Sequence, residues 1–218
     1  MNKYSVIVAG GTGTRMGSVV PKQFLMLNGQ SILLHTIGVF LKAYDDLNVI
    51  LVLPKEFVEG FEPIPRVKVV PGGLTRFHSV KNGLNAINDD NAIIFVHDAV
   101  RCLLTTNLIY SCYQIAVDKG NAIPAVKAVD SLRIQTTDGN AIVDRSKVWV
   151  IQTPQTFQSK ILMDAFKQEY DESFTDEASV VEKMGVKINL IEGETDNIKI
   201  TRPIDLIIAE KILDKRPS

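Results

Sequence analysis

Short runs of apolar, mostly β-branched residues alternate along this chain with longer segments of helical periodicity, and this alternation restricts the fold more than any other feature. The runs are continuously apolar, which is typical of strands buried on both faces of a parallel sheet. Helical connections between such strands cover both faces of the sheet. We therefore expect an α/β fold, namely a Rossmann-like doubly wound, mainly parallel sheet flanked by helices. The expected strands lie at Tyr4–Ala9, Leu47–Leu53, Val67–Val70, Ala92–His97 and Ala122–Val126, with helices at Ser31–Ala43, Ser79–Ile87 and Thr105–Lys119.

The middle of the chain breaks this rhythm. Ser131–Gln135 and Ala141–Asp144 are strand-like, and Thr136–Asn140 between them contains an Asp-Gly pair, which predicts a β-hairpin. A hairpin that projects from a doubly wound domain exposes its edges unless another subunit covers them. We expect one domain over residues 1–218 with 128–147 inserted as a β-arm for dimerisation, and a solvated loop on a monomer is the alternative. Later elements are expected at Val148–Gln152, Ser159–Glu169, Asp176–Met184, Val186–Ile191 and Pro203–Leu213.

Composition excludes several classes of protein. The 24 basic and 25 acidic residues give a formal charge of −1, so the chain has no general attraction for nucleic acid or an anionic membrane. No apolar run approaches the roughly 20 residues that span a bilayer, and the first residues leave no room for a signal peptide. Cys102 and Cys112 fit no metal-binding spacing and are expected to be reduced, partly buried thiols. We expect a cytoplasmic protein that binds neither nucleic acid nor membrane.

A glycine-rich segment, Ala9-Gly10-Gly11-Thr12-Gly13-Thr14-Arg15-Met16-Gly17, directly follows the first expected strand. Glycines there let the backbone approach a ligand and turn its N–H groups toward an anion. The spacing excludes a dinucleotide-binding loop, because the sixth position counted from Gly11 is Met16 and Phe24–Thr36 contains no acidic residue. It also excludes a Walker A loop, because no Gly-Lys-Ser/Thr tripeptide occurs here.

Two cations accompany this segment, Arg15 within it and Lys22 in the following Pro21-Lys22-Gln23. Fixed positive charge beside backbone donors suits a triphosphate whose α-phosphorus accepts a nucleophile. A tight turn without a ligand is the alternative interpretation. Asp98 ends a buried strand, the place where ligands bind in such sheets, and could meet a ribose hydroxyl or a metal ion there.

Together with Pro21-Lys22-Gln23-Phe24, the glycine-rich segment resembles the sugar-phosphate nucleotidyltransferases, in particular their cytidylyltransferase branch. Further matches extend over nearly the whole chain and resemble the 2-C-methyl-D-erythritol 4-phosphate cytidylyltransferase family. Each match is weak alone, whereas their order and spacing make the set specific. The matching segments are Gly72-Gly73 with Arg76 and Ser79-Val80, His97–Arg101, Val143–Arg145, Gln152–Gln155, Thr175–Ser179 and Asp196–Pro203.

The resemblance implies an enzyme that transfers a cytidylyl group from CTP to a small phosphorylated polyol, 2-C-methyl-D-erythritol 4-phosphate, with Mg²⁺ as cofactor. It implies that the phosphates are held by three catalytic cations, that the nucleotide meets a second set of residues, and that Asp98 is the metal or ribose ligand. Arg145, next to the hairpin, would complete the neighbouring subunit's site in a homodimer. The implied catalytic residues are Arg15, Lys22 and Lys199. The implied nucleotide-binding residues are Ala9, Gly10, Gly11, Gly73, Ser79 and Asp98. The implied substrate-binding residues are Arg101, Asp130, Ser131, Arg145, Thr153 and Thr175.

Two alternatives keep the same fold. One is a ribitol 5-phosphate cytidylyltransferase, against which Arg76–Ser79 and Val143–Arg145 favour the methylerythritol branch. The other is a nucleotide-sensing protein without turnover, which retention of the charged residues disfavours. Because a phosphate monoester is already anionic, the reaction needs no serine, cysteine or histidine nucleophile. Leu74 departs from the family, which often carries an acidic residue there, so backbone groups would replace that contact with the base.

Overall fold

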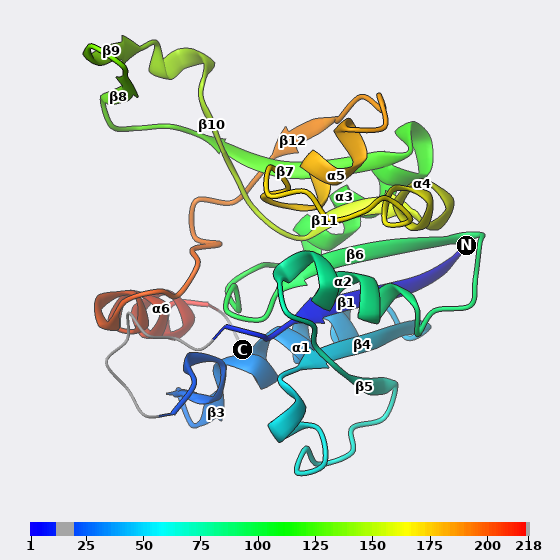
Figure 1. The fold of residues 1–218 in the computed structure, drawn as a ribbon. Helices are drawn as coiled ribbons and strands as arrows, with labels where there is room; N and C mark the ends of the chain where they lie inside the picture. The colour runs from blue at the N-terminus through cyan, green and yellow to red at the C-terminus, as the bar shows by residue number, and fades with distance from the viewer. Residues whose placement is uncertain (12–19, 217–218) are drawn as a thin grey trace.

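One eight-stranded sheet with helices on both faces organises the chain (Figure 1). The computed structural model describes residues 1–11 and 20–216. The strands of this sheet are β1 (Asn2–Val8), β4 (Leu47–Leu53), β5 (Val67–Pro71), β6 (Ala92–Asp98), β7 (Asn121–Lys127), β10 (Trp149–Ile151), β11 (Gln155–Gln158) and β12 (Leu190–Glu192). The α-helices are α1 (Ile32–Ala43), α2 (Arg76–Leu84), α3 (Thr106–Lys119), α4 (Ser159–Ala165), α5 (Glu177–Glu182) and α6 (Pro203–Asp214). Short elements are β2 (Met26–Leu27), β3 (Gln30–Ser31) and the 3-10 helices η2 (Lys22–Phe24), η3 (Lys55–Phe57) and η4 (Arg145–Lys147).

The strand order is β10-β7-β11-β6-β1-β4-β5, with β12 paired to β7. β1 pairs in parallel with β4 and β6, β4 with β5, and β12 with β7. β11 is antiparallel to β6 and β7, and β10 is antiparallel to β7. The expected doubly wound, mainly parallel α/β fold is confirmed.

The two faces of the sheet bury separate apolar clusters. Successive residues of β1 point to opposite faces: Ile7 belongs to the cluster under α1 and α3, and Val6 to the cluster under α2, α4 and α5. Both are fully buried, and burial of one such side chain stabilises the fold by about 1.5–3 kcal/mol. Burial on both faces explains why the strands are continuously apolar.

A third, smaller cluster lies under α6 and holds the chain segment that precedes this helix. Ile200 is fully buried there with Leu27, Ile32 and Leu103. The backbone N–H of Ile200 donates to the carbonyl of Val100 at 2.9 Å. The segment around Ile200 is thereby fixed beside the loop that leaves β6.

Some expected elements differ from those observed. The sequence did not predict β11, which lies antiparallel between β6 and β7. The strand expected at Val186–Ile191 is instead β12, Leu190–Glu192, and the helix expected to reach Glu169 ends at Ala165. All three differences concern short elements, in which the local pattern is weak and tertiary packing sets the bounds. None of the helices in the described part of the chain is long and apolar enough to span a bilayer.

The predicted hairpin is present. β8 (Leu132–Thr136) and β9 (Gly139–Val143) form a separate two-stranded antiparallel sheet that projects from the rest of the chain (Figure 1). Thr136 pairs with Gly139, whose φ of +132° is a backbone conformation that only glycine adopts readily. We call β8 and β9 the arm.

Candidate functional site

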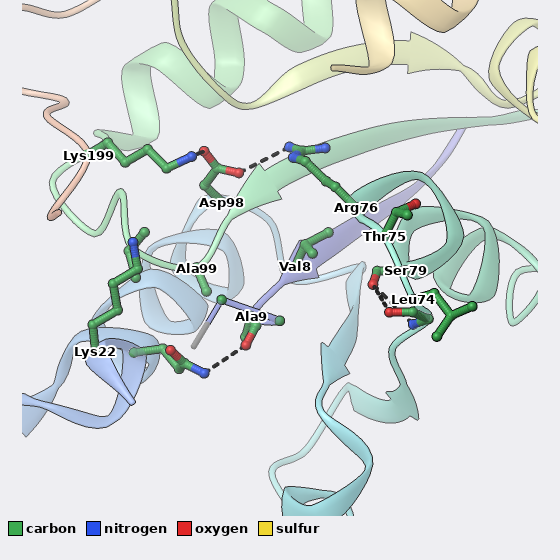
Figure 2. A pocket seen from close by; sticks show the side chains of 15 residues that line it. Val8, Ala9, Lys22, Leu74, Thr75, Arg76, Ser79, Asp98, Ala99 and Lys199 are labelled. Carbon is green, nitrogen blue, oxygen red and sulfur yellow. Dashed lines mark hydrogen bonds and ion pairs between the residues drawn. The ribbon is translucent and has the colours of Figure 1, made fainter. Parts of the chain in front are cut away.

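A cavity of about 320 Å³ opens where the carboxyl ends of β1 and β6 lie side by side (Figure 2). After β1, the chain passes through α1 on one face of the sheet to β4, which pairs with one edge of β1. After β5, it passes through α2 on the opposite face to β6, which pairs with the other edge of β1. This reversal of strand order is the point at which doubly wound sheets bind ligands. The lining residues are Val8, Ala9, Gly10, Gly11, Lys22, Gln23, Gly73, Leu74, Thr75, Arg76, Ser79, Asp98, Ala99, Val100 and Lys199.

The cavity wall that follows β1 consists of the backbone of Ala9, Gly10 and Gly11 and of a buried cation, Lys22. The N–H of Ala9 donates to the carbonyl of Val52 at 2.9 Å, and the carbonyl of Ala9 accepts from the Gln23 side chain at 2.7 Å. Gln23 thus ties η2 to the end of β1. Its neighbour Lys22 is 9% exposed, and its Nζ donates to the carbonyl of Ile200 at 3.2 Å. Arg15, like all of residues 12–19, lies outside the described residues.

The opposite wall is the tight start of α2. The hydroxyl of Ser79 accepts the N–H of Gly73 at 3.1 Å, and the hydroxyl of Thr75 caps the helix by accepting the N–H of His78 at 3.4 Å. A Cβ at Gly73 would lie 2.4 Å from the Cβ of His78, so only glycine fits. Leu74 is 99% exposed beside this wall. An apolar side chain next to backbone polar groups suits a planar base.

The carboxylate of Asp98 lines the cavity and is surrounded by three basic side chains. Its Oδ1 lies 3.0 Å from Arg76 Nη2, and its Oδ2 lies 2.8 Å from Lys199 Nζ and 3.6 Å from Arg101 Nε. Figure 2 shows Lys199 and Arg76 reaching Asp98 from opposite sides. Burial alone would raise the pKa of Asp98, but Arg76, Lys199 and Arg101 outweigh it and hold the pKa well below its usual range. Asp98 is therefore a carboxylate at neutral pH.

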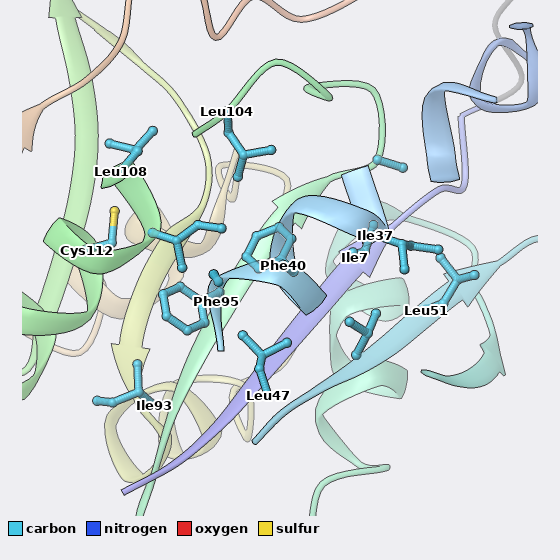
Figure 3. Packing of buried hydrophobic residues seen from close by; sticks show 14 of the residues in the cluster. Ile7, Ile37, Phe40, Leu47, Leu51, Ile93, Phe95, Leu104, Leu108 and Cys112 are labelled. Carbon is cyan, nitrogen blue, oxygen red and sulfur yellow. The ribbon is translucent and has the colours of Figure 1, made fainter. Parts of the chain in front are cut away.

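Directly behind Asp98, a neutral histidine fixes the backbone. His97 is fully buried, and its ring packs edge-on to that of Phe40 with the ring centroids 5.2 Å apart. Phe40 belongs to the core cluster of Figure 3. Burial lowers the pKa of His97 to about 3. Its Nε2 lies 3.1 Å from the carbonyl of Arg101, and its Nδ1 lies 3.0 Å from the hydroxyl of Thr153, which also accepts the N–H of Asp98 at 3.1 Å.

The predicted nucleotide-binding residues meet around one cavity, whereas the predicted substrate-binding residues do not line it. Thr153 is buried behind Asp98, and Arg101 donates to the carbonyls of Asn197 and Ile151 at 2.9 and 3.4 Å. Arg145, Asp130 and Ser131 are exposed at the base of the arm. Thr175 is exposed before α5. These assignments stay predictions.

Four residues of the site were not predicted to bind or react, namely Gln23, Arg76, Asn197 and Glu177. Gln23 tethers η2, Asn197 donates to the carbonyl of Thr153 at 2.9 Å, and Glu177 pairs with Arg76. Asn197 and Glu177 lie inside segments that the sequence singled out, but their partners are far away along the chain. Burial, which marks both residues, could not be read from the sequence.

A divalent cation in this cavity would find one carboxylate ligand among the described residues. Asp98 is the only acidic side chain among the described residues that line the cavity. Within residues 1–11 and 20–216, no group of three or more His, Cys, Asp or Glu side chains could hold a metal ion by itself. Mg²⁺ commonly binds through one or two carboxylates together with the phosphates of a substrate. The donor set therefore fits Mg²⁺ that arrives with a nucleotide.

Comparisons with known proteins agree with this geometry. The family model described as 2-C-methyl-D-erythritol 4-phosphate cytidylyltransferase matches residues 4–215. Proteins of that name from Bacteroides thetaiotaomicron and Phocaeicola vulgatus are 44% and 41% identical, and each match covers 98% of this chain and 100% of the relative. The crystal structure of the Francisella tularensis protein of that name is 31% identical and superposes with a TM-score of 0.84, over 97% of this chain and 100% of that one.

Proposed function

Because this chain belongs to the 2-C-methyl-D-erythritol 4-phosphate cytidylyltransferase family, we propose that it transfers a cytidylyl group from CTP to 2-C-methyl-D-erythritol 4-phosphate in the cavity between β1 and β6. The observation that carries this assignment of the site is the cluster of Lys199, Arg76 and Arg101 around the single carboxylate of Asp98. It lies beside open backbone at Gly10 and Gly11. Such a cluster suits two polyanionic substrates.

The reaction is a direct displacement. An oxygen of the substrate's phosphate attacks the α-phosphorus of CTP, the new phosphorus–oxygen bond forms, and the bond to the β-phosphate breaks in line with it. Pyrophosphate leaves with the bonding electrons, and the product is 4-diphosphocytidyl-2-C-methyl-D-erythritol. Since the attacking phosphate is already anionic, the protein contributes alignment and charge rather than a covalent intermediate.

The residues of the cavity divide this work. We propose that the backbone of Ala9, Gly10 and Gly11 holds the ribose and phosphates, and that Gly73 and Ser79 face the base. Lys22, whose Nζ contacts the carbonyl of Ile200, and the neighbouring Lys199 would stabilise the negative charge of the transition state. Arg15 joins them in this proposal from outside the described residues. The burial of Lys22 suits this role because charges interact more strongly away from water.

We also propose Mg²⁺ as cofactor, held by Asp98 together with the phosphates of CTP. When bound, it would neutralise phosphate charge and hold the triphosphate in one conformation. Asp98 is suited to this role because its depressed pKa keeps it ionised. Lys199, which pairs with the same carboxylate at 2.8 Å, would move to the α-phosphate as the nucleotide binds.

The arm is proposed to join two copies of the chain. One face of its two strands is apolar and carries Ile134, which is 59% exposed. Val129, which precedes β8, is 83% exposed. A two-stranded sheet is marginally stable alone, so cover by a second copy would stabilise it. Arg145, whose Nη1 donates to the carbonyl of Val129 at 2.7 Å, would then complete the site of the other subunit. A cytoplasmic location also stays our proposal.

The test of this function is release of pyrophosphate from CTP and Mg²⁺ with either 2-C-methyl-D-erythritol 4-phosphate or ribitol 5-phosphate. We expect release with the first alcohol only. Lys22→Ala and Lys199→Ala should lower turnover by about 10²–10³-fold, as loss of other preorganised charge-stabilising groups does. Lys167→Ala, which removes a lysine paired only at the surface with Asp164, is the control and should keep full activity. Release with ribitol 5-phosphate alone would overturn the choice of substrate, and release with neither would overturn the enzymatic function.

A further inference from the structure

Arg76 links the carboxylate of the cavity to a second, fully buried carboxylate. Its Nη2 contacts Oδ1 of Asp98 at 3.0 Å, and its Nη1 contacts Oε1 of Glu177, 101 residues away along the chain. The side chain of Glu177 is 2% exposed, whereas that of Arg76 is 31% exposed on the wall of the cavity. A buried carboxylate thus anchors, from inside the protein, a guanidinium on the wall of the cavity.

Glu177 is itself held in place at the start of α5. Asp176 caps this helix by accepting the N–H of Ser179 at 2.9 Å. The side chain of Gln155 in β11 donates to Asp176 and accepts the N–H of Ala178, both at 2.8 Å. These bonds hold the side chain of Asp176 and the N–H of Ala178, the two neighbours of Glu177 in the chain. The carboxylate is therefore aimed at Arg76 by the fold and not by the ion pair alone.

A buried carboxylate is costly unless something is gained from it. Oε2 of Glu177 has no hydrogen-bond partner among the described residues, so the guanidinium of Arg76 is the group that compensates this charge. Burial raises the pKa of Glu177 and Arg76 opposes that rise, so the charge of Glu177 depends on Arg76 staying in place. Such a buried pair contributes little net stability to a core, and its main consequence here is the fixed position of Arg76.

We propose that Glu177 is a positioning residue of the cytidylyl-transfer site, which fixes Arg76 and through it the orientation of the Asp98 carboxylate. With Oδ1 held by Arg76, Oδ2 faces Lys199 and is the oxygen offered to the nucleotide and its cation. Without Glu177, Arg76 would have one partner instead of two and could turn into the cavity. The inference rests on the proposed function, because it assigns Glu177 to that reaction.

The test is a double-mutant cycle on pyrophosphate release. Glu177→Gln is nearly isosteric and removes only the charge, so we expect kcat to fall about tenfold, the loss that follows when a charge-assisted bond becomes a neutral one. KM for CTP should stay within about threefold, because backbone groups that Glu177 does not touch hold the nucleotide. Glu182→Gln makes the same change at the exposed end of α5, away from Arg76, and should leave kcat unchanged.

The second arm of the cycle uses Arg76→Gln with and without Glu177→Gln. If Glu177 acts only through Arg76, adding Glu177→Gln to Arg76→Gln should change kcat no further. The double variant removes both charges together and so avoids an unpaired buried charge if a single variant folds poorly. Unchanged kcat in Glu177→Gln, or equal losses in both backgrounds, would overturn the inference. Wild-type protein measured in parallel separates this from failure of the proposed function, in which wild type itself would release no pyrophosphate.

Discussion

Two glycines on opposite walls of the cavity should respond differently to the same added methyl group. A Cβ at Gly73 would lie 2.4 Å from the Cβ of His78, whereas a Cβ at Gly10 would lie 3.9 Å from its nearest neighbour, the hydroxyl of Ser79. Neither glycine has a positive φ, so alanine strains neither backbone. The contrast between Gly73→Ala and Gly10→Ala therefore separates packing within the protein from the space kept for a ligand.

The magnitudes follow from these distances. Carbon atoms in contact lie about 3.5–4.0 Å apart, so Gly73→Ala must displace the first turn of α2 by about 1 Å. Overpacking of this kind costs about 1–3 kcal/mol, which lowers the melting temperature of a chain of this size by about 2–4 °C per kcal/mol. Gly10→Ala should change the free energy of unfolding by no more than about 0.5 kcal/mol. Its methyl group would instead occupy the space where the triphosphate meets the backbone, and loss of one such hydrogen bond should weaken CTP binding about tenfold.

The assay is a thermal melt of each variant without ligand, followed by calorimetric titration with CTP and Mg²⁺. We expect Gly73→Ala to melt earlier than wild type, and Gly10→Ala to melt with wild type and bind CTP more weakly. The reasoning is refuted if Gly10→Ala binds CTP as tightly as wild type. It is also refuted if the two variants lose equal thermal stability.

Three further predictions concern other parts of the chain. Lys199→Ala should reduce kcat much more than it reduces stability, because the lysine side chain is 41% exposed and its pair with Asp98 is partly screened; parallel kinetics and melts would show the reverse if Lys199 were mainly structural. Cys102 and Cys112 are free and buried, and burial raises the pKa of each thiol to about 12, so a thiol reagent at pH 8 should label them only after denaturation; rapid labelling of the native protein would contradict the observed burial. Ile134→Asp on the apolar face of the arm should shift the protein from dimer to monomer in light scattering, whereas Gln135→Glu on the other face should not; a dimer unaffected by Ile134→Asp would exclude the arm as the interface.

The sheet was predictable because burial on both faces is visible in the residues of each strand. β1, β4 and β6 are buried on both faces, so a continuous apolar run identifies each one without knowledge of its neighbours. β11 was missed because it begins with the polar residues Gln155 and Thr156, which are 1% and 0% exposed. Only the fold reveals that Gln155 is satisfied by the start of α5.

The residues of the site also divide into those that local sequence predicts and those that only the fold reveals. Ala9, Gly10 and Gly11, which begin the glycine-rich segment, and Asp98 lie at the ends of buried strands, so their meeting at one edge of the sheet follows from the topology. Glu177 and Asn197 act through partners more than 40 residues away along the chain, and no local pattern marks them. The predicted substrate residues Arg145 and Thr175 lie away from the cavity of their own chain.

The central claim, that this cavity transfers a cytidylyl group, is tested most directly by the fate of labelled CTP. The chain would be incubated with Mg²⁺, 2-C-methyl-D-erythritol 4-phosphate and CTP labelled at either the α- or the γ-phosphate, and the products would be separated by chromatography. We predict that the α-label enters the diphosphocytidyl product and that the γ-label is released in pyrophosphate. Recovery of the α-label as free CMP, or only as unreacted CTP, would contradict the claim.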